Sequence, residues 1–341
     1  MDLQNKTLIE WLDNAPKELY PLHKKTDFHA HYIKLEDYLN ENVHKEVTIG
    51  ANLVNPEMLL NDHGPEHIET VISRASYLVG STTCQLTPYE TYLLLCCIQL
   101  HDVGNLFGRY KHEKNAKEIM LAAEGICGRS VIEALKIKNI AEAHGGRTDK
   151  GNKDKITPLE PKSNTNDGEI RPQMLAAILR FADELADDKS RSLSTLLIKG
   201  KIPKPSEVFH AYAMCLESVM VNHNENAINL TFHVPRNFLE KKFVKEDSKI
   251  LLLDEIYLRV LKMHYERIYC MRFCKDIIEI DKILVTIEFY DKTLVDVFPK
   301  ISFELSENGY PDSNSDIFSL CEELTVEDGI LNGEYVKSKI K

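Results

Sequence analysis

The chain has 341 residues, of which 43% are hydrophobic and 28% charged, values that are ordinary for a globular protein and allow two modest domains. Its formal net charge of −11 argues against binding to a nucleic-acid backbone or an anionic membrane, because both partners require a basic surface. Double-stranded nucleic acid and membranes are therefore not expected as partners. A small phosphate ester is not excluded, because a bound metal can supply the positive charge locally.

The start of the chain and its cysteines bear on its compartment. The first residues lack a basic region followed by an apolar core, and no apolar run approaches ~18 residues, so neither a signal peptide nor a membrane span is expected. None of the eight cysteines stands in a C-x-x-C pair, and several lie in apolar helical runs. We therefore expect free, buried thiols in a reducing compartment, the cytoplasm. Cys270 and Cys274 have helical i, i+4 spacing and could bind a metal, but we interpret them as core thiols on the long helix.

The first two thirds of the chain read as helical. Residues 1–60 predict an N-terminal helical extension with short helices at 6–14 and 34–43. Residues 61–192 predict a helical domain, with helices over 65–80, 88–102, 112–125, 130–146 and 171–188. The helix over 88–102 is apolar nearly all round, which predicts a central position in the bundle. The polar stretch 147–169 predicts a long exposed loop.

The pattern changes near residue 193. Residues 218–234 predict a β-hairpin that turns near Asn224–Asn226, and residues 249–273 predict a long amphipathic helix. Two more strands are expected over 282–291 and 299–306, followed by an acidic tail. This strand-strand-helix-strand-strand order predicts a smaller C-terminal α+β domain over 193–341. The fold class is therefore predicted to be mainly α.

Six polar residues occupy positions where the pattern of the bundle calls for apolar ones. Burying a carboxylate without a partner costs several kcal/mol, so two carboxylates and four imidazoles pointing into one bundle need a shared explanation. One or two divalent metals provide it, because they neutralise carboxylates and accept imidazole nitrogen, and helical bundles commonly hold such sites. The predicted ligands are His67, His101, Asp102, His112, His144 and Asp183.

These residues stand in motifs that resemble a known family. "HIETV" with His67, "LHDVGN" with His101 and Asp102, and "LRFADELADD" with Asp183 resemble the signature of the HD-domain metal-dependent phosphohydrolases. "YKHEKNAKEIM" and "IAEAHGG" are similar, in order and setting, to the additional histidine motifs of two-metal members. The resemblance covers roughly residues 60–192 and implies an HD-type helical bundle.

The resemblance also implies a reaction. One metal would be held by His67, His101, Asp102 and Asp183, and a second by Asp102, His112 and His144. Asp102 and His101 would be the catalytic pair beside a metal-bound hydroxide, and Mn, Fe, Co and Ni suit such mixed nitrogen and oxygen ligands. The implied substrate is a phosphate monoester, diester or anhydride, most plausibly a nucleotide. A non-catalytic nucleotide-sensing HD module and an HD nuclease acting on single-stranded nucleic acid are the two alternatives.

The sequence departs from the family pattern at one position. Many relatives have a lysine after the glycine of the doublet motif, and this chain has Asn105. Asn105 and three arginines near the ligands, Arg109, Arg147 and Arg191, are therefore the predicted substrate-binding residues. "NDHGPEH" and "ADELADD" also resemble HD modules of bacterial conflict systems found with Hsp90-type ATPases, which implies a defence-system partner protein, with a homo-oligomer as another option.

Several structural readings compete with this prediction. A buried histidine is often a hydrogen-bonded core residue, and Asp183 could form an ion pair with Arg180 or Arg191. His63 competes with His67 as the first ligand, but we expect it to precede the helix and to cap or stack at its entrance.

A second motif, "TDFHAHY", places His29 and His31 in the H-x-H arrangement that opens the metal site of amidohydrolase-type barrels. A barrel needs alternating strands and helices after it, which residues 65–190 do not offer. We therefore interpret these histidines as surface or packing residues.

Overall fold

The computed structural model describes residues 6–20, 26–54, 59, 63–80, 86–108, 111–123, 125–291, 296–307 and 316–340. The chain divides into two compact units. The first comprises Met1–Pro56, Asp62–Ala186 and Cys270–Ile278, and the second comprises Glu57–Asn61, Asp187–Tyr269 and Glu279–Lys341. The N-terminal residues thus belong to the same unit as the helices that follow them. The prediction of a mainly helical protein is confirmed.

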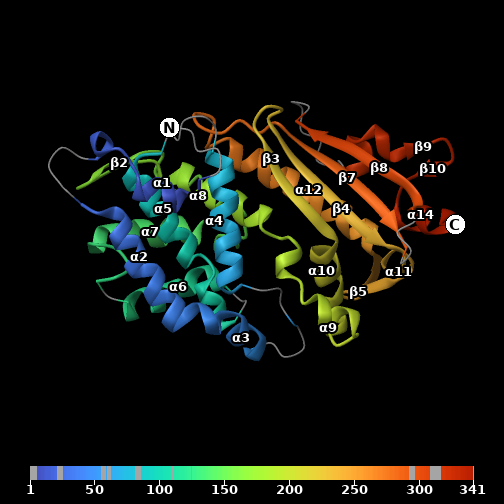
Figure 1. Ribbon diagram of the computed structural model, residues 1–341, viewed down its shortest axis with the longest axis horizontal. Coiled ribbons are helices and arrows are strands. Elements are labelled where there is room, and N and C mark those ends of the chain that lie inside the picture. Colours follow the sequence, from blue (N-terminus) through green and yellow to red (C-terminus); the bar gives the residue numbers. More distant parts are fainter. Residues whose placement is uncertain are drawn as a thin grey trace. The chain divides into compact units, whose positions relative to one another are not determined.

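The first unit is built from helices (Figure 1). Its helices are α1 (Leu8–Asp13), α2 (Phe28–Leu39), α3 (Lys45–Val54), α4 (Pro65–Val79), α5 (Pro88–Leu100), the 3-10 helix η3 (Val103–Phe107), α6 (His112–Ala122), α7 (Val131–Glu142) and α8 (Pro172–Leu185). A π-helical turn at Asn40–His44 joins α2 to α3, so the helix predicted over 34–43 begins earlier and continues further. The predicted loop over 147–169 contains β1 (Ser163–Thr165), which pairs with β2 (Gly168–Ile170).

Helix α5 lies at the centre of the first unit, as its apolar sequence predicts. All its residues are buried, and Thr87 and Glu90 form a capping box that fixes where the helix begins. The Glu90 carboxylate also accepts hydrogen bonds from Arg171, from its backbone N at 3.1 Å and from Nε and Nη2 at 2.8 Å. Because Arg171 immediately precedes α8, these bonds hold the starts of α5 and α8 together.

A buried ion-pair network supports the same helices. The Arg129 guanidinium bonds to the Glu133 carboxylate and lies 2.9 Å from Asp167 Oδ2. Glu133, which is 4% exposed, also accepts hydrogen bonds from the hydroxyls of Tyr89 at 2.9 Å and Tyr92 at 3.1 Å. The guanidinium lies over both tyrosine rings, with centroid distances of 5.3 and 5.5 Å. Each buried charge in this network therefore has several partners.

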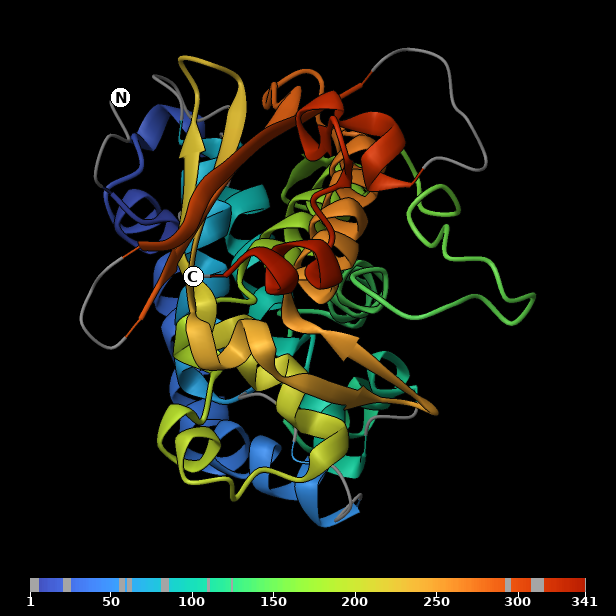
Figure 2. The same ribbon diagram turned by 90° about the vertical axis from the view of Figure 1, so that its right-hand side faces the viewer.

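The second unit contains a four-stranded sheet in the order β3 (Leu216–Asn222), β4 (Ala227–Pro235), β7 (Lys282–Tyr290) and β8 (Asp296–Ser306). β3 and β4 form the predicted hairpin, and β4 and β7 are parallel. Helix α12 (Leu252–Met271) connects the parallel strands and packs on the sheet, where the Tyr257 and Phe303 rings are 5.8 Å apart (Figures 1 and 2). The helix predicted from residue 249 begins later, because β6 (Ser248–Leu251) pairs with β5 (Lys242–Lys245).

Shorter elements complete the second unit: α9 (Ser194–Ile198), α10 (Lys204–Cys215), α11 (Arg236–Glu240), α13 (Ile317–Leu320), β9 (Thr325–Val326), β10 (Gly329–Ile330) and α14 (Gly333–Lys339). Elements α13, β9, β10 and α14 belong to the acidic tail, in which the sequence pattern is weak.

Helix α12 buries two basic side chains in the second unit. Arg267 is 2% exposed, and its Nη1 donates a 2.8 Å hydrogen bond to the Ile280 carbonyl. Its Nε and Nη2 have no hydrogen-bond partner among the described residues, and neither has Nδ1 of His264, one turn earlier. Burial, reinforced by the charge of Arg267, lowers the pKa of His264 to about 4. The imidazole of His264 is therefore neutral near pH 7.

The seven cysteines in the described part of the chain are free and buried, as predicted, and Cys84 lies outside it. Cys270 and Cys274 are among the buried thiols. Within the described residues, no helix combines the length and the apolar character that crossing a bilayer requires.

Candidate metal centre

The end of helix α5 carries the two adjacent residues at the middle of the site. His101 is the C-cap of α5, and Asp102 follows it and precedes η3. The side chain of His101 is fully buried and that of Asp102 is 5% exposed. The Nδ1–H of His101 donates to the Ile98 carbonyl at 2.7 Å, so Nε2 is the nitrogen that a metal could bind.

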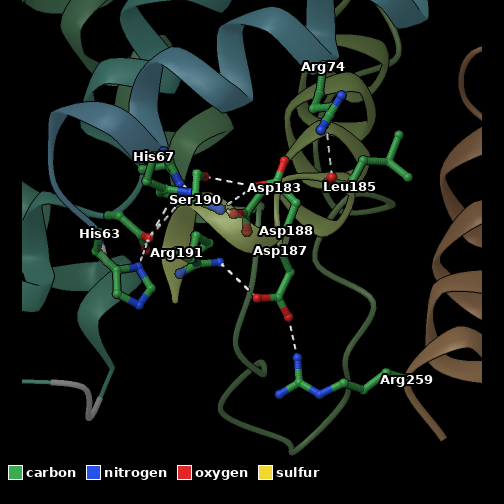
Figure 3. A network of polar contacts seen from close by, with 12 residues as sticks. His63, His67, Arg74, Asp183, Leu185, Asp187, Asp188, Ser190, Arg191 and Arg259 are labelled. Carbon is green, nitrogen blue, oxygen red and sulfur yellow. Dashed lines mark hydrogen bonds and ion pairs between the residues drawn. The ribbon is translucent and has the colours of Figure 1, made fainter. Parts of the chain in front are cut away.

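The first ligand group joins three helices of the first unit. His67 comes from α4, His101 and Asp102 from the end of α5, and Asp183 from α8, and one ligand atom of each lies within 4.8 Å of all the others. His67 Nε2 lies 3.3 Å from Asp183 Oδ1 and 3.6 Å from Asp102 Oδ2. Arg74 of α4 donates from Nε to the Leu185 carbonyl at 3.2 Å, which ties α4 to the end of α8 beside Asp183 (Figure 3).

The second ligand group shares Asp102 with the first. Asp102, His112 and His144 have ligand atoms within 4.8 Å of one another. Asp102 Oδ1 lies 3.1 Å from His112 Nε2 and 3.7 Å from His144 Nε2. His144 follows α7, which ends at Glu142 and not at the predicted residue 146, and its Nδ1–H donates to the Ala141 carbonyl at 2.6 Å. His144 therefore also presents Nε2 towards the shared carboxylate.

The donor set fits a divalent metal. Nε2 of His67 and Nε2 of His101 are buried without a hydrogen-bond partner among the described residues, yet both face carboxylate oxygens. Backbone acceptors at Nδ1 fix the tautomers of His101 and His144 in the manner usual for metal-binding histidines. Mixed imidazole and carboxylate ligands suit divalent transition metals. These clusters could therefore bind divalent metal ions.

The same clustering controls the protonation of these side chains. Burial alone would raise the pKa of Asp102, but the neighbouring imidazoles of His101, His63, His112 and His144 hold it well below its usual range. Burial would likewise raise the pKa of Asp183, yet His101 and His67 hold it well below the usual range. Both carboxylates are thus ionised.

The imidazoles of His101 and His144 differ in pKa. For His101, burial opposes the charged form, but Asp102 and Asp183 outweigh it and raise the pKa to about 9. For His144, burial outweighs its contacts with Asp102 and lowers the pKa. A divalent cation bound among these residues would displace the proton from His101 and replace its charge.

The four predicted substrate-binding residues lie in different environments. Asn105 of η3 is fully buried, and its side-chain amide has no hydrogen-bond partner among the described residues. Arg147 is exposed and donates from Nη1 to the Gly151 carbonyl at 2.8 Å within its own loop. Arg191 belongs to the second unit, where its Nη1 lies 3.8 Å from Asp187 Oδ1, and Arg109 lies outside the described residues.

The other competing residues are placed as follows. Asp187 also pairs with Arg259, so it lies between two arginines of the second unit (Figure 3). Arg180, which we weighed as a partner of Asp183, donates to the Lys153 carbonyl at 3.1 Å. His29 and His31 lie in helix α2 and are partly exposed, with His29 Nδ1 3.3 Å from Asp13 Oδ1. Their segment is helical, which contradicts the barrel alternative.

For His63, the sequence predicted the position before α4 but not the contact with Asp102. It precedes α4, and its ring meets that of His67 edge-on at 5.5 Å, as a stacking role predicts. However, its Nδ1 also lies 2.6 Å from Asp102 Oδ2 in the interior of the unit. The spacing of four residues from His67 was the only signal for it in the sequence.

The fold and the cluster together define an HD-type domain, mainly helical, with buried histidines and aspartates that could bind divalent metals. The family model named HD-CE matches residues 56–256, which is more than half of the chain. The chain therefore belongs to the HD-CE family. Neither the curated proteins nor the solved structures gave a match.

Proposed function

We propose that this chain is a metal-dependent phosphohydrolase that acts on a nucleotide or a related phosphate ester. The observation that supports it best is the pair of ligand groups that share the Asp102 carboxylate. Two cations about 3.5–4 Å apart, bridged by a carboxylate, are the arrangement that stabilises both the attacking and the leaving oxygens of phosphoryl transfer. Mn²⁺, Fe²⁺, Co²⁺ and Ni²⁺ match these ligands.

A phosphate suits the charge of this site. The ligand set contains two carboxylates, and the remaining ligands are imidazoles that bind metals in their neutral form. With two divalent cations the cluster carries a net positive charge, which attracts an anionic phosphate even though the chain as a whole is acidic. Asp183 is the most exposed ligand, with 27% of its side chain accessible, so we expect substrate to approach beside it.

Each ligand residue then has a defined task. A bound divalent metal would supply Lewis-acid charge and lower the pKa of a water ligand towards neutrality. Asp102 joins the two ligand groups through its two oxygens, and Asp183 completes the first group at its open side. His101 and His144, whose Nδ1–H groups bond to backbone carbonyls, hold their Nε2 atoms in place. Burial of these residues limits the access of other water to the site.

The test is Asp102→Ala, purified intact and compared with Asp149→Ala. Asp149 pairs with Lys114 on the surface and is 85% exposed, so it matches the chemistry of the change without touching the cluster. We expect Asp102→Ala to lose both bound metal and phosphatase or phosphodiesterase turnover, while Asp149→Ala keeps both. Full turnover in Asp102→Ala would contradict the proposed function.

A substrate panel separates the proposal from its alternatives. The wild-type protein is incubated with Mn²⁺ and with a single-stranded oligonucleotide, cyclic dinucleotides or deoxynucleoside triphosphates. Hydrolysis of a small nucleotide supports the proposal, whereas cleavage of the oligonucleotide alone would favour the nuclease. Binding of a nucleotide without turnover would favour a sensing module. The defence-system partner protein and the homo-oligomer stay predictions.

A further inference from the structure

We propose that His63 is a positioning residue that fixes the orientation of the shared Asp102 carboxylate and so supports both ligand groups. This inference rests on the proposed metal-dependent function. His63 Nδ1 lies 2.6 Å from Asp102 Oδ2, and the two side chains are 6% and 5% exposed. In this contact the carboxylate oxygen accepts and the His63 ring donates Nδ1–H. A hydrogen bond of this length to a buried carboxylate is charge-assisted and strong.

The position of this bond on the carboxylate explains its effect. Asp102 Oδ1 faces the second group, with His112 Nε2 at 3.1 Å, whereas Oδ2 faces the first group, with His101 Nε2 at 3.5 Å. Each oxygen can face its own group only when the plane of the carboxylate has one particular orientation. Because His63 bonds to Oδ2, it favours that orientation of the carboxylate before any metal binds. Hydrogen bonds from outside the ligand set commonly orient metal ligands in this way.

The local sequence holds His63 at this place. Gly64 caps α4, and its carbonyl accepts a 3.2 Å hydrogen bond from the Ile68 backbone. Pro65 at the first position of the helix fixes the direction of the chain as it enters α4. His63 therefore lies just outside the helix while His67 lies one turn inside it, and their rings meet edge-on. One short segment thus supplies a ligand to the cluster and a hydrogen bond to its shared carboxylate.

His63 is assigned to positioning, and not to ligation, because its ring nitrogens do not converge with the ligand atoms of either group. Neither ligand group among the described residues includes it.

The experiment replaces His63 in three ways and measures metal binding. His63→Phe fills the space but has no donor, His63→Asn places an amide nitrogen near the position of Nδ1, and His63→Gln places it near Nε2. His233→Phe, at a histidine 41% exposed in the second unit, is the matched control. Mn²⁺ affinity is measured by calorimetry on the full-length apo protein, and the Co²⁺-loaded proteins are compared by visible spectroscopy.

We expect His63→Phe to bind Mn²⁺ about 10–100-fold more weakly than wild type, the range typical for residues that orient metal ligands. His63→Asn should recover most of this loss and His63→Gln little of it, while the Co²⁺ bands of His63→Asn stay at their wild-type positions. Unchanged affinity in His63→Phe would overturn the assignment, and so would shifted Co²⁺ bands in His63→Asn, which would make His63 a ligand. If wild type binds neither Mn²⁺ nor Co²⁺, the proposed function fails first.

Discussion

The substitution Asp183→Asn tests whether the stability of the first unit is linked to metal binding. It keeps the shape of the side chain but removes the charge that faces His67 Nε2 at 3.3 Å and His101 Nε2 at 3.7 Å. Metal that binds only the folded state stabilises it by about 2.7 kcal/mol at 100 times its dissociation constant. Asp183 is a direct ligand in the proposed site. Its loss should therefore weaken metal binding by at least about 100-fold, the largest effect typical of residues that only orient ligands. The residual stabilisation at the same concentration is then about 0.4 kcal/mol.

The assay is thermal unfolding of chelator-treated protein with increasing Mn²⁺, in which each variant is compared with its own apo form. At about 2–4 °C per kcal/mol, wild type should rise by about 5–10 °C and Asp183→Asn by about 1 °C. Asp149→Asn makes the same chemical change at a surface position and should behave as wild type. An equal rise in wild type and Asp183→Asn would refute the reasoning, because the metal would then bind without this carboxylate.

Three further substitutions test the energetics of buried charges. Arg129→Met should cost about 3–5 kcal/mol in urea unfolding, because it leaves the buried Glu133 carboxylate without its cation. Arg267→Met should be neutral or stabilising by about 1–2 kcal/mol, because the guanidinium edge formed by Nε and Nη2 has no described partner; a large loss would contradict this. His264→Gln should flatten the pH dependence of stability. The folded pKa of about 4 lies below the unfolded value of about 6.5, so wild type should lose about 1 kcal/mol, after solvent screening, as pH falls from 7 to 5.

The predicted ligands illustrate what helical periodicity can reveal about a site. His67 and Asp183 were predicted because they lie on the inward stripes of their helices, and the structure places a ligand atom of each within 4.8 Å of one of Asp102. Periodicity states which face of a helix a residue occupies, and in a bundle inward faces converge. Their assignment as metal ligands stays a prediction.

Residues outside regular helices could not be placed by this reasoning. His63 precedes α4, so no pattern indicates the direction of its side chain, and its bond to Asp102 spans 39 residues of sequence. Arg147 was selected because it follows His144 closely along the chain. Its side chain instead closes its own loop by bonding to the Gly151 carbonyl, because neighbours in a loop need not share a direction.

The errors in the predicted elements have local physical causes. Ile250 and Leu251 continue the apolar run that opens α12, and a short apolar run does not distinguish a strand from a helix. Pairing of residues 248–251 with β5 decides for the strand. In the loop over 147–169, Asn166 and Asp167 form the turn between β1 and β2, and Gly168 follows with a positive φ of 129°; the polar composition concealed this hairpin. Thr165 Oγ1 donates to the Gly168 carbonyl at 2.8 Å across that turn.

Gly104 explains why the doublet of His101 and Asp102 can serve two ligand groups. A Cβ atom at this position would lie 1.9 Å from the His112 carbonyl oxygen, so only glycine lets η3 approach the start of α6 this closely. That approach brings His112 Nε2 to 3.1 Å from Asp102 Oδ1, while Oδ2 stays with the residues of α4 and α5. The opening of η3 thus joins the two groups through one carboxylate, because a larger residue would push α6, and His112 with it, away from Asp102. The glycine that follows the doublet is therefore as much a part of the site as the ligands themselves.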